Sequence, residues 1–310
     1  MHAWTTRESV RRLAEELRQR QPCRLVVHLE DNEQQLLAHA LGRSPAEIEA
    51  LPAAALDALV PPDLSHPRRS REFLAGADGV TLITARLREL APAAARCLTL
   101  WPAADARYFY PRPTPGEFRR TLGFGPDMTV LFYHGNVHAA NAVEVGELYT
   151  AVARLNEEGT PTTLIRAGLD TVAFPGAEAA RAHVLALGQI LHHHHLPPLM
   201  ALADIFVQPG VPDAFNDYRF PSKLPEFFAL GRPVVLPRTN LGERVRHGVD
   251  AYVLARADAD GIVSAVRALR ADSALAARLA TGAARFAEEN FSWRRSAEAL
   301  AKFYLALAPS

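Results

Sequence analysis

Residues 216–235 read NDYRFPSKLPEFFALGRPVV, and this stretch decides the fold that the sequence predicts. Pro225 lacks an N–H group and is tolerated only in the first turn of a helix, so a helix has to begin just before it. Ser222 suits the N-cap, which makes Lys223 the first helical residue. Gly231 supplies the left-handed position that ends many helices. An apolar run of strand length follows at once, and this order is typical of a parallel α/β sheet.

The same alternation of helices and apolar strands runs through most of the chain. Residues 101–118 (WPAADARYFYPRPTPGEF) interrupt it with four prolines and predict an interdomain linker. We expect strands at 24–29, 79–83, 97–100, 130–133, 163–165, 184–187, 205–207, 233–236 and 251–254. We expect helices at 6–20, 33–41, 45–58, 66–76, 85–90, 141–157, 222–231 and 294–307, with more helix from 258. The predicted fold class is α/β, with two doubly wound parallel sheets.

The composition excludes several classes of partner. The 310 residues carry 34 Lys+Arg and 34 Asp+Glu, so the formal net charge is zero. A nucleic-acid partner is not expected, because proteins that bind phosphate backbones gather Lys and Arg on one face. Cys23 and Cys97 lie in apolar runs and are predicted to be buried free thiols. No apolar run reaches the roughly 20 residues of a membrane-spanning helix. Free thiols fit a reducing compartment, so we expect a cytoplasmic protein, with peripheral contact at the inner membrane face left open.

Lys223 and Glu226 are the most informative pair of polar residues. They lie three residues apart and therefore share one face of the predicted helix, and Arg219 adds a second cation just before it. A cation at a helix N-terminus suits a diphosphate, and a carboxylate one turn deeper can accept hydrogen bonds from both hydroxyls of a ribose. The alternative is a surface ion pair, worth roughly a few tenths of a kcal/mol. The flanking proline, serine and glycine favour the nucleotide-binding interpretation.

This block resembles the donor-site signature of glycosyltransferases with the GT-B fold, especially family 4 and its group 1 relatives. In that signature an R-x-P-x-K-x-x-E-Y-x-A-x-G-x-P-V-V pattern leads into a strand. Shorter stretches extend the resemblance over nearly the whole chain: the glycine loop after the first donor-domain strand, the A-D-x-x-V-x-P segment, the end of the acceptor domain, and the start of a C-terminal helix that crosses back. These stretches are 133–136 (YHGN), 202–209 (LADIFVQP), 78–80 with 101–105, and 291–293 (FSW).

The resemblance implies a donor site for a nucleotide sugar. Arg219 and Lys223 would hold the diphosphate and act in catalysis, and Glu226 would hold the ribose. No metal or other cofactor is expected, because the two cations take the place of a divalent ion. The candidate donor-binding residues are Gly135, Asn136, Arg219, Ser222, Lys223 and Glu226. Two positions depart from the family, since Tyr218 stands where many members carry a Glu near the sugar and Asn141 stands where many carry a Lys.

Three further features keep alternatives open. His28 resembles the acceptor-domain histidine that reaches the interdomain cleft, which makes it a third candidate catalytic residue, and the alternative is a histidine satisfied within the core. Glu30 and Asp31 either bind acceptor hydroxyls and transfer protons or are solvated loop carboxylates. The run His192–His195 is a metal-binding tract, an affinity tag or a loop near the nucleotide base. Consecutive residues cannot all ligate one ion, and this favours the loop.

The resemblance also divides the chain into segments. Residues 1–105 form a partial acceptor-side Rossmann-like domain, 106–113 a linker, 114–290 a donor-binding Rossmann-like domain, and 291–310 the helix that crosses back. Relatives begin with a strand and a glycine-rich turn, whereas a helix is expected at the start of this sequence. The N-terminal domain is therefore expected to lack its first strands. A misplaced start site, a truncated gene and a second chain that completes the sheet are the three explanations.

The predicted activity is transfer of a sugar from a UDP- or GDP-linked donor to an unidentified glycan, lipid or small-molecule acceptor, with retention of anomeric configuration. One alternative is a non-catalytic nucleotide-sugar-binding protein or subunit with an incomplete acceptor domain. Another is a GT-B epimerase, which binds the same donors but needs acid and base carboxylates across the cleft.

Overall fold

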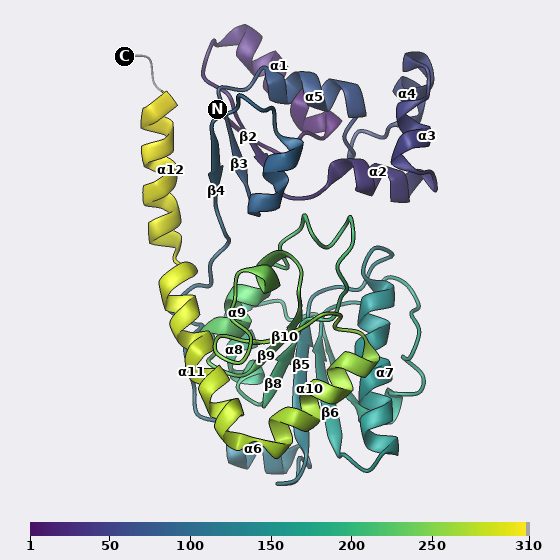
Figure 1. Ribbon diagram of the computed structural model, residues 1–310, viewed down its shortest axis with the longest axis vertical. Helices are drawn as coiled ribbons and strands as arrows, with labels where there is room; N and C mark the ends of the chain where they lie inside the picture. The colour runs from purple at the N-terminus through teal and green to yellow at the C-terminus, as the bar shows by residue number, and fades with distance from the viewer. Residues whose placement is uncertain (308–310) are drawn as a thin grey trace. The chain divides into compact units, whose positions relative to one another are not determined.

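The apolar runs of this sequence become the strands of two parallel sheets, one in each of two compact units. The computed structural model describes residues 1–307 (Figure 1). The first unit comprises Met1–Pro102, Asp213–Phe220 and the chain from Arg294, and the second unit comprises Ala103–Pro212 and Pro221–Trp293. The segment Asp213–Phe220 thus clusters with the first unit, although the sequence analysis assigns it to the donor domain. The last three residues of the predicted segment 291–310 lie outside the described residues.

The sheet of the first unit has four parallel strands in the order β1-β2-β3-β4. These are β1 (His2–Trp4), β2 (Val26–Leu29), β3 (Gly79–Leu82) and β4 (Cys97–Thr99). Every residue of β2 and β3 is buried, which explains why apolar residues stand at successive positions rather than alternating with solvated ones. The expectation that the described chain starts with a helix is wrong, because β1 precedes the helix. Three residues are too few to show a strand period.

The sheet of the first unit is accompanied by six α-helices and one 3₁₀ helix among the described residues. They are α1 (Glu8–Arg20), α2 (Glu33–Leu41), α3 (Pro45–Glu49), α4 (Ala53–Leu59), α5 (Pro67–Ala75), the 3₁₀ helix η1 (Ala85–Leu90) and α12 (Trp293–Leu307). The predicted helix 45–58 is two helices. Ser44 and Glu47 form a capping box that starts α3, and Pro52 is the N-cap of α4. At the other end of the chain, Arg96 donates to the carbonyl oxygen of Ala306 in the last turn of α12.

The second unit contains a six-stranded parallel sheet in the order β10-β9-β8-β5-β6-β7. Its strands are β5 (Thr129–His134), β6 (Thr162–Ala167), β7 (Val184–Gly188), β8 (Ile205–Val207), β9 (Val234–Pro237) and β10 (Tyr252–Leu254). The chain adds β6 and β7 on one side of β5, then returns and adds β8 to β10 on the other. The strand order therefore reverses between β5 and β8. Ligands of doubly wound sheets bind at the carboxyl ends of the strands at such a switch point.

The helices of the second unit pack on both faces of this sheet. They are α6 (Gly116–Thr121), α7 (Ala142–Glu157), α8 (Leu196–Met200), α9 (Leu224–Ala229), α10 (Ala259–Ala271) and α11 (Ser273–Asn290), with the 3₁₀ helices η2 (Arg181–His183), η3 (His193–His195) and η4 (Asn240–Glu243). Apolar residues of α7 and α10 share one core with Leu131 and Tyr133 of β5. On the opposite face of β5, Phe132 meets Phe206 edge to face, and Phe206 stacks on Phe227 of α9.

Helix α9 differs from its prediction in two respects. It begins at Leu224 with Lys223 as its N-cap, one residue later than expected, and no side chain caps it. Pro225 is then the second helical residue, where its missing N–H costs nothing. The helix is only six residues long, so its dipole contributes less than a full-length helix would. Gly231 does adopt the predicted left-handed conformation, with φ 61°.

The two cysteines do not share one environment. Cys97 lies in β4 and is partly buried, whereas Cys23 is exposed in the loop before β2. The prediction of a buried Cys23 is wrong because Pro22 and Arg24 beside it are exposed and the strand starts only at Val26.

Within residues 1–307, no helix is long and apolar enough to cross a membrane.

Candidate functional site

Four of the predicted site residues come together at the switch point of the second unit. Gly135 and Asn136 form the loop directly after β5, and Lys223 and Glu226 lie at the start of α9. Gln208 follows β8, the strand on the other side of the switch. We call Gly135, Lys223, Glu226 and the side chains that contact them the Lys223–Glu226 site.

Gly135 allows the lysine to lie against the loop. Its φ of 115° belongs to the region that favours glycine. A Cβ added there would lie 3.2 Å from Cε and 3.5 Å from Nζ of Lys223, which is tighter than ordinary van der Waals contact for the first atom. The loop and the lysine therefore approach each other as closely as a glycine permits.

The charge of Lys223 meets only neutral groups. Its Nζ donates to the hydroxyl of Tyr133 and to Oε1 of Gln208, both at 3.4 Å, and lies 4.6 Å from the centre of the Tyr133 ring. No carboxylate among the described residues forms an ion pair with this lysine. Both hydrogen bonds are long, so they hold the ammonium group weakly. A cation held this way at the carboxyl end of a parallel sheet is suited to an anionic ligand.

Hydrogen bonds to the end of β6 and to the loop after it hold the glycine loop in place. Gly135 donates its N–H to the carbonyl oxygen of Ala167, and the side chain of Asn136 accepts from the N–H of Leu169. Asn141 stands where family members often carry a lysine, and here its amide bridges the loop by donating to the carbonyl oxygen of Asn136 and accepting from the N–H of His138. Asn141 is buried, so it braces the loop rather than presenting a cation to a ligand.

Glu226 has two imidazole neighbours that the sequence analysis did not identify. Nε2 of His134 lies 2.8 Å from Oε2, and Nε2 of His193 lies 3.2 Å from Oε1. The contact with His134 is close but is not aligned as a hydrogen bond, so Oε2 is a buried acceptor without a hydrogen-bond donor in the described residues. Burial lowers the pKa of His134, and the carboxylate of Glu226 offsets only part of that effect. A buried oxygen left without a hydrogen bond costs about 1–3 kcal/mol.

The remaining predicted residues have other contacts. Ser222 is exposed and stands one residue before the N-cap, so it does not cap α9 as predicted. Arg219 belongs to the first unit, where its guanidinium carbon lies 4.4 Å from the centre of the Phe215 ring. Tyr218 in the same segment donates its hydroxyl to Glu89 of η1 at 2.8 Å.

His28 is a buried residue of β2 in the first unit. Its Nδ1 lies 2.8 Å from the hydroxyl of Thr81, and the ring of Trp4 stacks on it at 4.0 Å. Burial lowers its pKa to about 4, with His2 as a smaller cause. Its other ring nitrogen, Nε2, is buried without a hydrogen-bond partner among the described residues, so the histidine is not fully satisfied within the core and its catalytic role stays a prediction. Glu30, just after the same strand, has its pKa raised mainly by burial.

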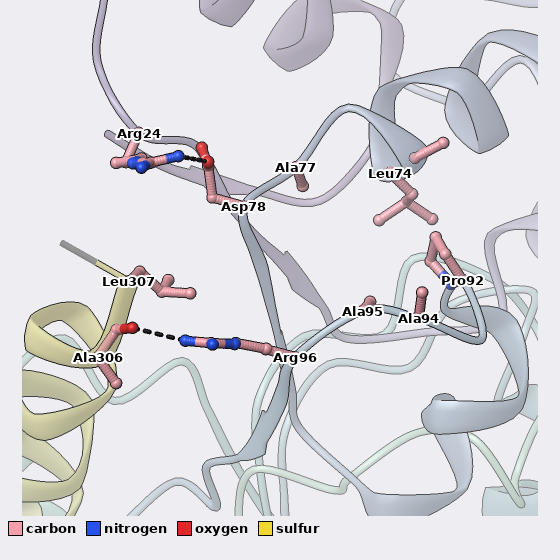
Figure 2. Close-up of a pocket in the computed structure, with 11 residues that line it drawn as sticks. Arg24, Leu74, Ala77, Asp78, Pro92, Ala94, Ala95, Arg96, Ala306 and Leu307 are labelled. Atoms are coloured by element: carbon pink, nitrogen blue, oxygen red, sulfur yellow. Dashed lines mark hydrogen bonds and ion pairs between the residues drawn. The ribbon is translucent and has the colours of Figure 1, made fainter. Parts of the chain in front are cut away.

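A separate cavity of about 560 Å³ lies in the first unit, where β3 and β4 begin (Figure 2). Its polar groups are already engaged. Arg24 pairs with Asp78 at 2.5 Å, Asp78 also accepts from the N–H of Leu25, and Arg96 binds the last turn of α12. Because this is the amino end of a parallel sheet, it is also the edge that ligands use least. The described residues contain no cluster of His, Cys, Asp and Glu that could hold a metal ion, the four consecutive histidines included.

In a comparison with known proteins, a protein-family model matches part of the second unit. Residues 128–272 match the family model described as glycosyl transferases group 1. A curated relative, the glycogen synthase of Mycobacterium tuberculosis (strain ATCC 25618 / H37Rv), is 31% identical over 211 residues. That match covers 66% of this chain and 45% of the relative, so the chain spans about half the length of the curated relatives it matches.

Solved structures match both units. The Anabaena protein HepE, solved in complex with UDP, matches with a TM-score of 0.72 and 16% identity over 98% of this chain and 78% of that one. The sucrose-phosphate synthase of Thermosynechococcus elongatus matches with a TM-score of 0.71 and 19% identity over 99% of this chain and 73% of that one. These likenesses confirm the predicted fold class, the two-sheet α/β architecture of GT-B proteins.

Proposed function

Because residues 128–272 belong to the group 1 glycosyltransferase family, we propose that this chain transfers a sugar from a nucleoside-diphosphate sugar to an acceptor hydroxyl. The bond between the anomeric carbon and the diphosphate oxygen breaks, and the acceptor oxygen bonds to that carbon and loses its proton. The anomeric configuration is retained.

The proposal rests on two polar groups at the switch point, the ammonium group of Lys223 and the carboxylate of Glu226, whose interactions within the protein are incomplete. Lys223 is a cation without a carboxylate partner in the described residues, and Oε2 of Glu226 is a buried acceptor without an aligned donor. A diphosphate on Lys223 and ribose hydroxyls on Glu226 would satisfy both at once. A surface ion pair between the two residues, the structural alternative, is absent from the described contacts, because Glu226 pairs with histidines instead.

In this proposal the protein acts mainly by electrostatics. Lys223 stabilises the charge that develops on the departing diphosphate, and the absence of a side chain at Gly135 lets the loop lie close to it. No divalent ion takes part, since Lys223 supplies the positive charge. The uridine series is the first to test, because a relative with the same fold has been solved with UDP and UDP-glucose, and the guanosine series is the second.

Release of nucleoside diphosphate tests the proposal. The whole chain is incubated with UDP-glucose, other UDP-sugars and GDP-sugars, with and without a panel of saccharide and lipid acceptors, and the freed UDP or GDP is measured. We expect release that depends on Lys223 and persists in excess chelator. Lys302, the other lysine of the sequence, is exposed in α12 and gives the matched control Lys302→Ala.

Two outcomes would contradict the proposal. Donor binding without release under every condition would support the non-catalytic nucleotide-sugar-binding alternative. Release that stops completely on chelation would overturn the metal-independent part of the mechanism.

A further inference from the structure

The proposed ribose carboxylate is already occupied on one side. Oε1 of Glu226 lies 3.2 Å from Nε2 of His193, at a distance where a neutral or a charged imidazole can donate to it. A carboxylate oxygen that accepts from an imidazole has less capacity left for a hydroxyl. The nucleoside and His193 therefore have a common target.

His193 and His134 differ in their freedom to move away. His134 is the last residue of β5, and its side chain is mostly buried. His193 starts the short 3₁₀ helix η3, and 58% of its side chain is exposed. Rotation of an exposed side chain on a short turn is fast and costs little, whereas a side chain at the end of a central strand is held by the sheet. Of the two imidazoles, His193 is the one that a ligand can displace.

The groups around His193 hold it near the carboxylate. Its ring lies 4.9 Å from the ring of Phe109, a buried residue. The charged or titratable groups that face it are Glu226 of α9, Asp105 in the segment before Phe109, and His134 of β5, with Lys223 near His134 and the other histidines of 192–195 beside it. Both carboxylates attract a protonated imidazole, and Asp105 is already bound to Arg107.

We propose that His193 is a gate at the ribose subsite: it binds Glu226 in the free protein and has to leave before a nucleoside can bind. This inference rests on the proposed function, because it takes Glu226 as the ribose acceptor. The run of four histidines, which suggests a metal tract in the sequence, thus has one member with a specific role at the nucleotide site.

Calorimetric titration with uridine and UDP tests the gate in the whole chain. We expect His193→Ala to bind both ligands about two- to fivefold more tightly, the range for a partly exposed ion pair. Uridine carries no phosphate, so its affinity does not include the diphosphate contact. His194→Ala is the matched control, since His194 is an exposed neighbour that contacts Tyr108 and His195 rather than Glu226. Unchanged or weaker binding by His193→Ala would overturn the gate.

A second background separates this inference from the proposed function. In Glu226→Gln the gate has little to hold, so adding His193→Ala should change uridine affinity by less than it does in the unaltered protein. If Glu226→Gln by itself leaves uridine binding unchanged, the proposed ribose role of Glu226 fails. If it weakens binding while His193→Ala still brings no gain, only the gate fails. Melting temperatures of all variants check that each one is folded.

Discussion

Lys223 and Glu226 should recognise different parts of one nucleotide, and substitution of each should leave a different signature. Lys223→Ala removes the cation proposed for the diphosphate. Glu226→Gln keeps the shape of the side chain but weakens its acceptance of ribose hydroxyls. The first variant should lose affinity for diphosphates alone, and the second should lose affinity for nucleoside, monophosphate and diphosphate by a similar factor.

The size of the first effect follows from the contacts of Lys223. A hydrogen bond between ionised partners contributes about 1.5–3 kcal/mol, which corresponds to a roughly 10- to 150-fold loss of UDP affinity. The folded protein should lose little stability, because the lysine makes only two long hydrogen bonds, to Tyr133 and Gln208. A loss of less than about 1 kcal/mol is expected for such contacts.

Titration of UDP, UMP and uridine, and of the guanosine series, against both variants and Lys302→Ala measures these patterns. Thermal melting of each variant gives the change in stability. If both substitutions leave every titration unchanged in folded protein, the Lys223–Glu226 site does not bind the donor. If Lys223→Ala weakens uridine as much as UDP, the lysine does not act on the phosphates.

Two further predictions concern the glycine loop and the buried histidine. Gly135→Ala should cost about 1–3 kcal/mol of stability and also weaken UDP binding, since φ is 115° and the new Cβ would crowd Lys223. Gly123→Ala is the control and should lower stability alone, because Gly123 has a φ of 76° but lies in open space. Equal UDP affinities for the two variants would contradict the close approach of Lys223 to the loop. The pKa of His28, lowered to about 4 in the folded state, implies that unfolding takes up a proton, so stability present above about pH 6.5 is lost as the pH falls towards 4. Between pH 7 and pH 5, the free energy of unfolding of His28→Gln, measured with urea, should therefore fall by up to about 2 kcal/mol less than that of the unaltered protein. Equal falls for the two proteins would refute this.

Local sequence patterns predict the second sheet well. The strand at 205–207 has the same bounds in the structure, and the helix expected at 141–157 begins one residue later. Both are bounded by polar or proline residues and contain apolar residues of the right period, so local preference and burial agree. Gly231 was predictable for the same reason, because a left-handed residue between a helix and a strand favours glycine.

The errors fall where local preference is weak or where two rules compete. β1 has three residues and no visible period, and it forms because it pairs with β2. Ser222 is a good N-cap residue by type, yet the turn before α9 places Lys223 at that position. Propensity cannot decide between two adjacent starting points for a six-residue helix, because each gains or loses a single hydrogen bond.

The site itself shows what sequence spacing leaves out. Spacing predicts that Lys223 and Glu226 share one helix face, and this prediction depends only on the local geometry of one helix. Whether the two residues pair with each other depends on what lies opposite, and here the end of β5 brings His134 to the carboxylate, while Tyr133 and Gln208 bind the ammonium group. The strand order that places β5 beside β8 produces these contacts between residues far apart in the chain. Because each charged group is thereby kept from the other, the lysine keeps its charge available to an anion, and this separation is the physical basis of the proposed donor site.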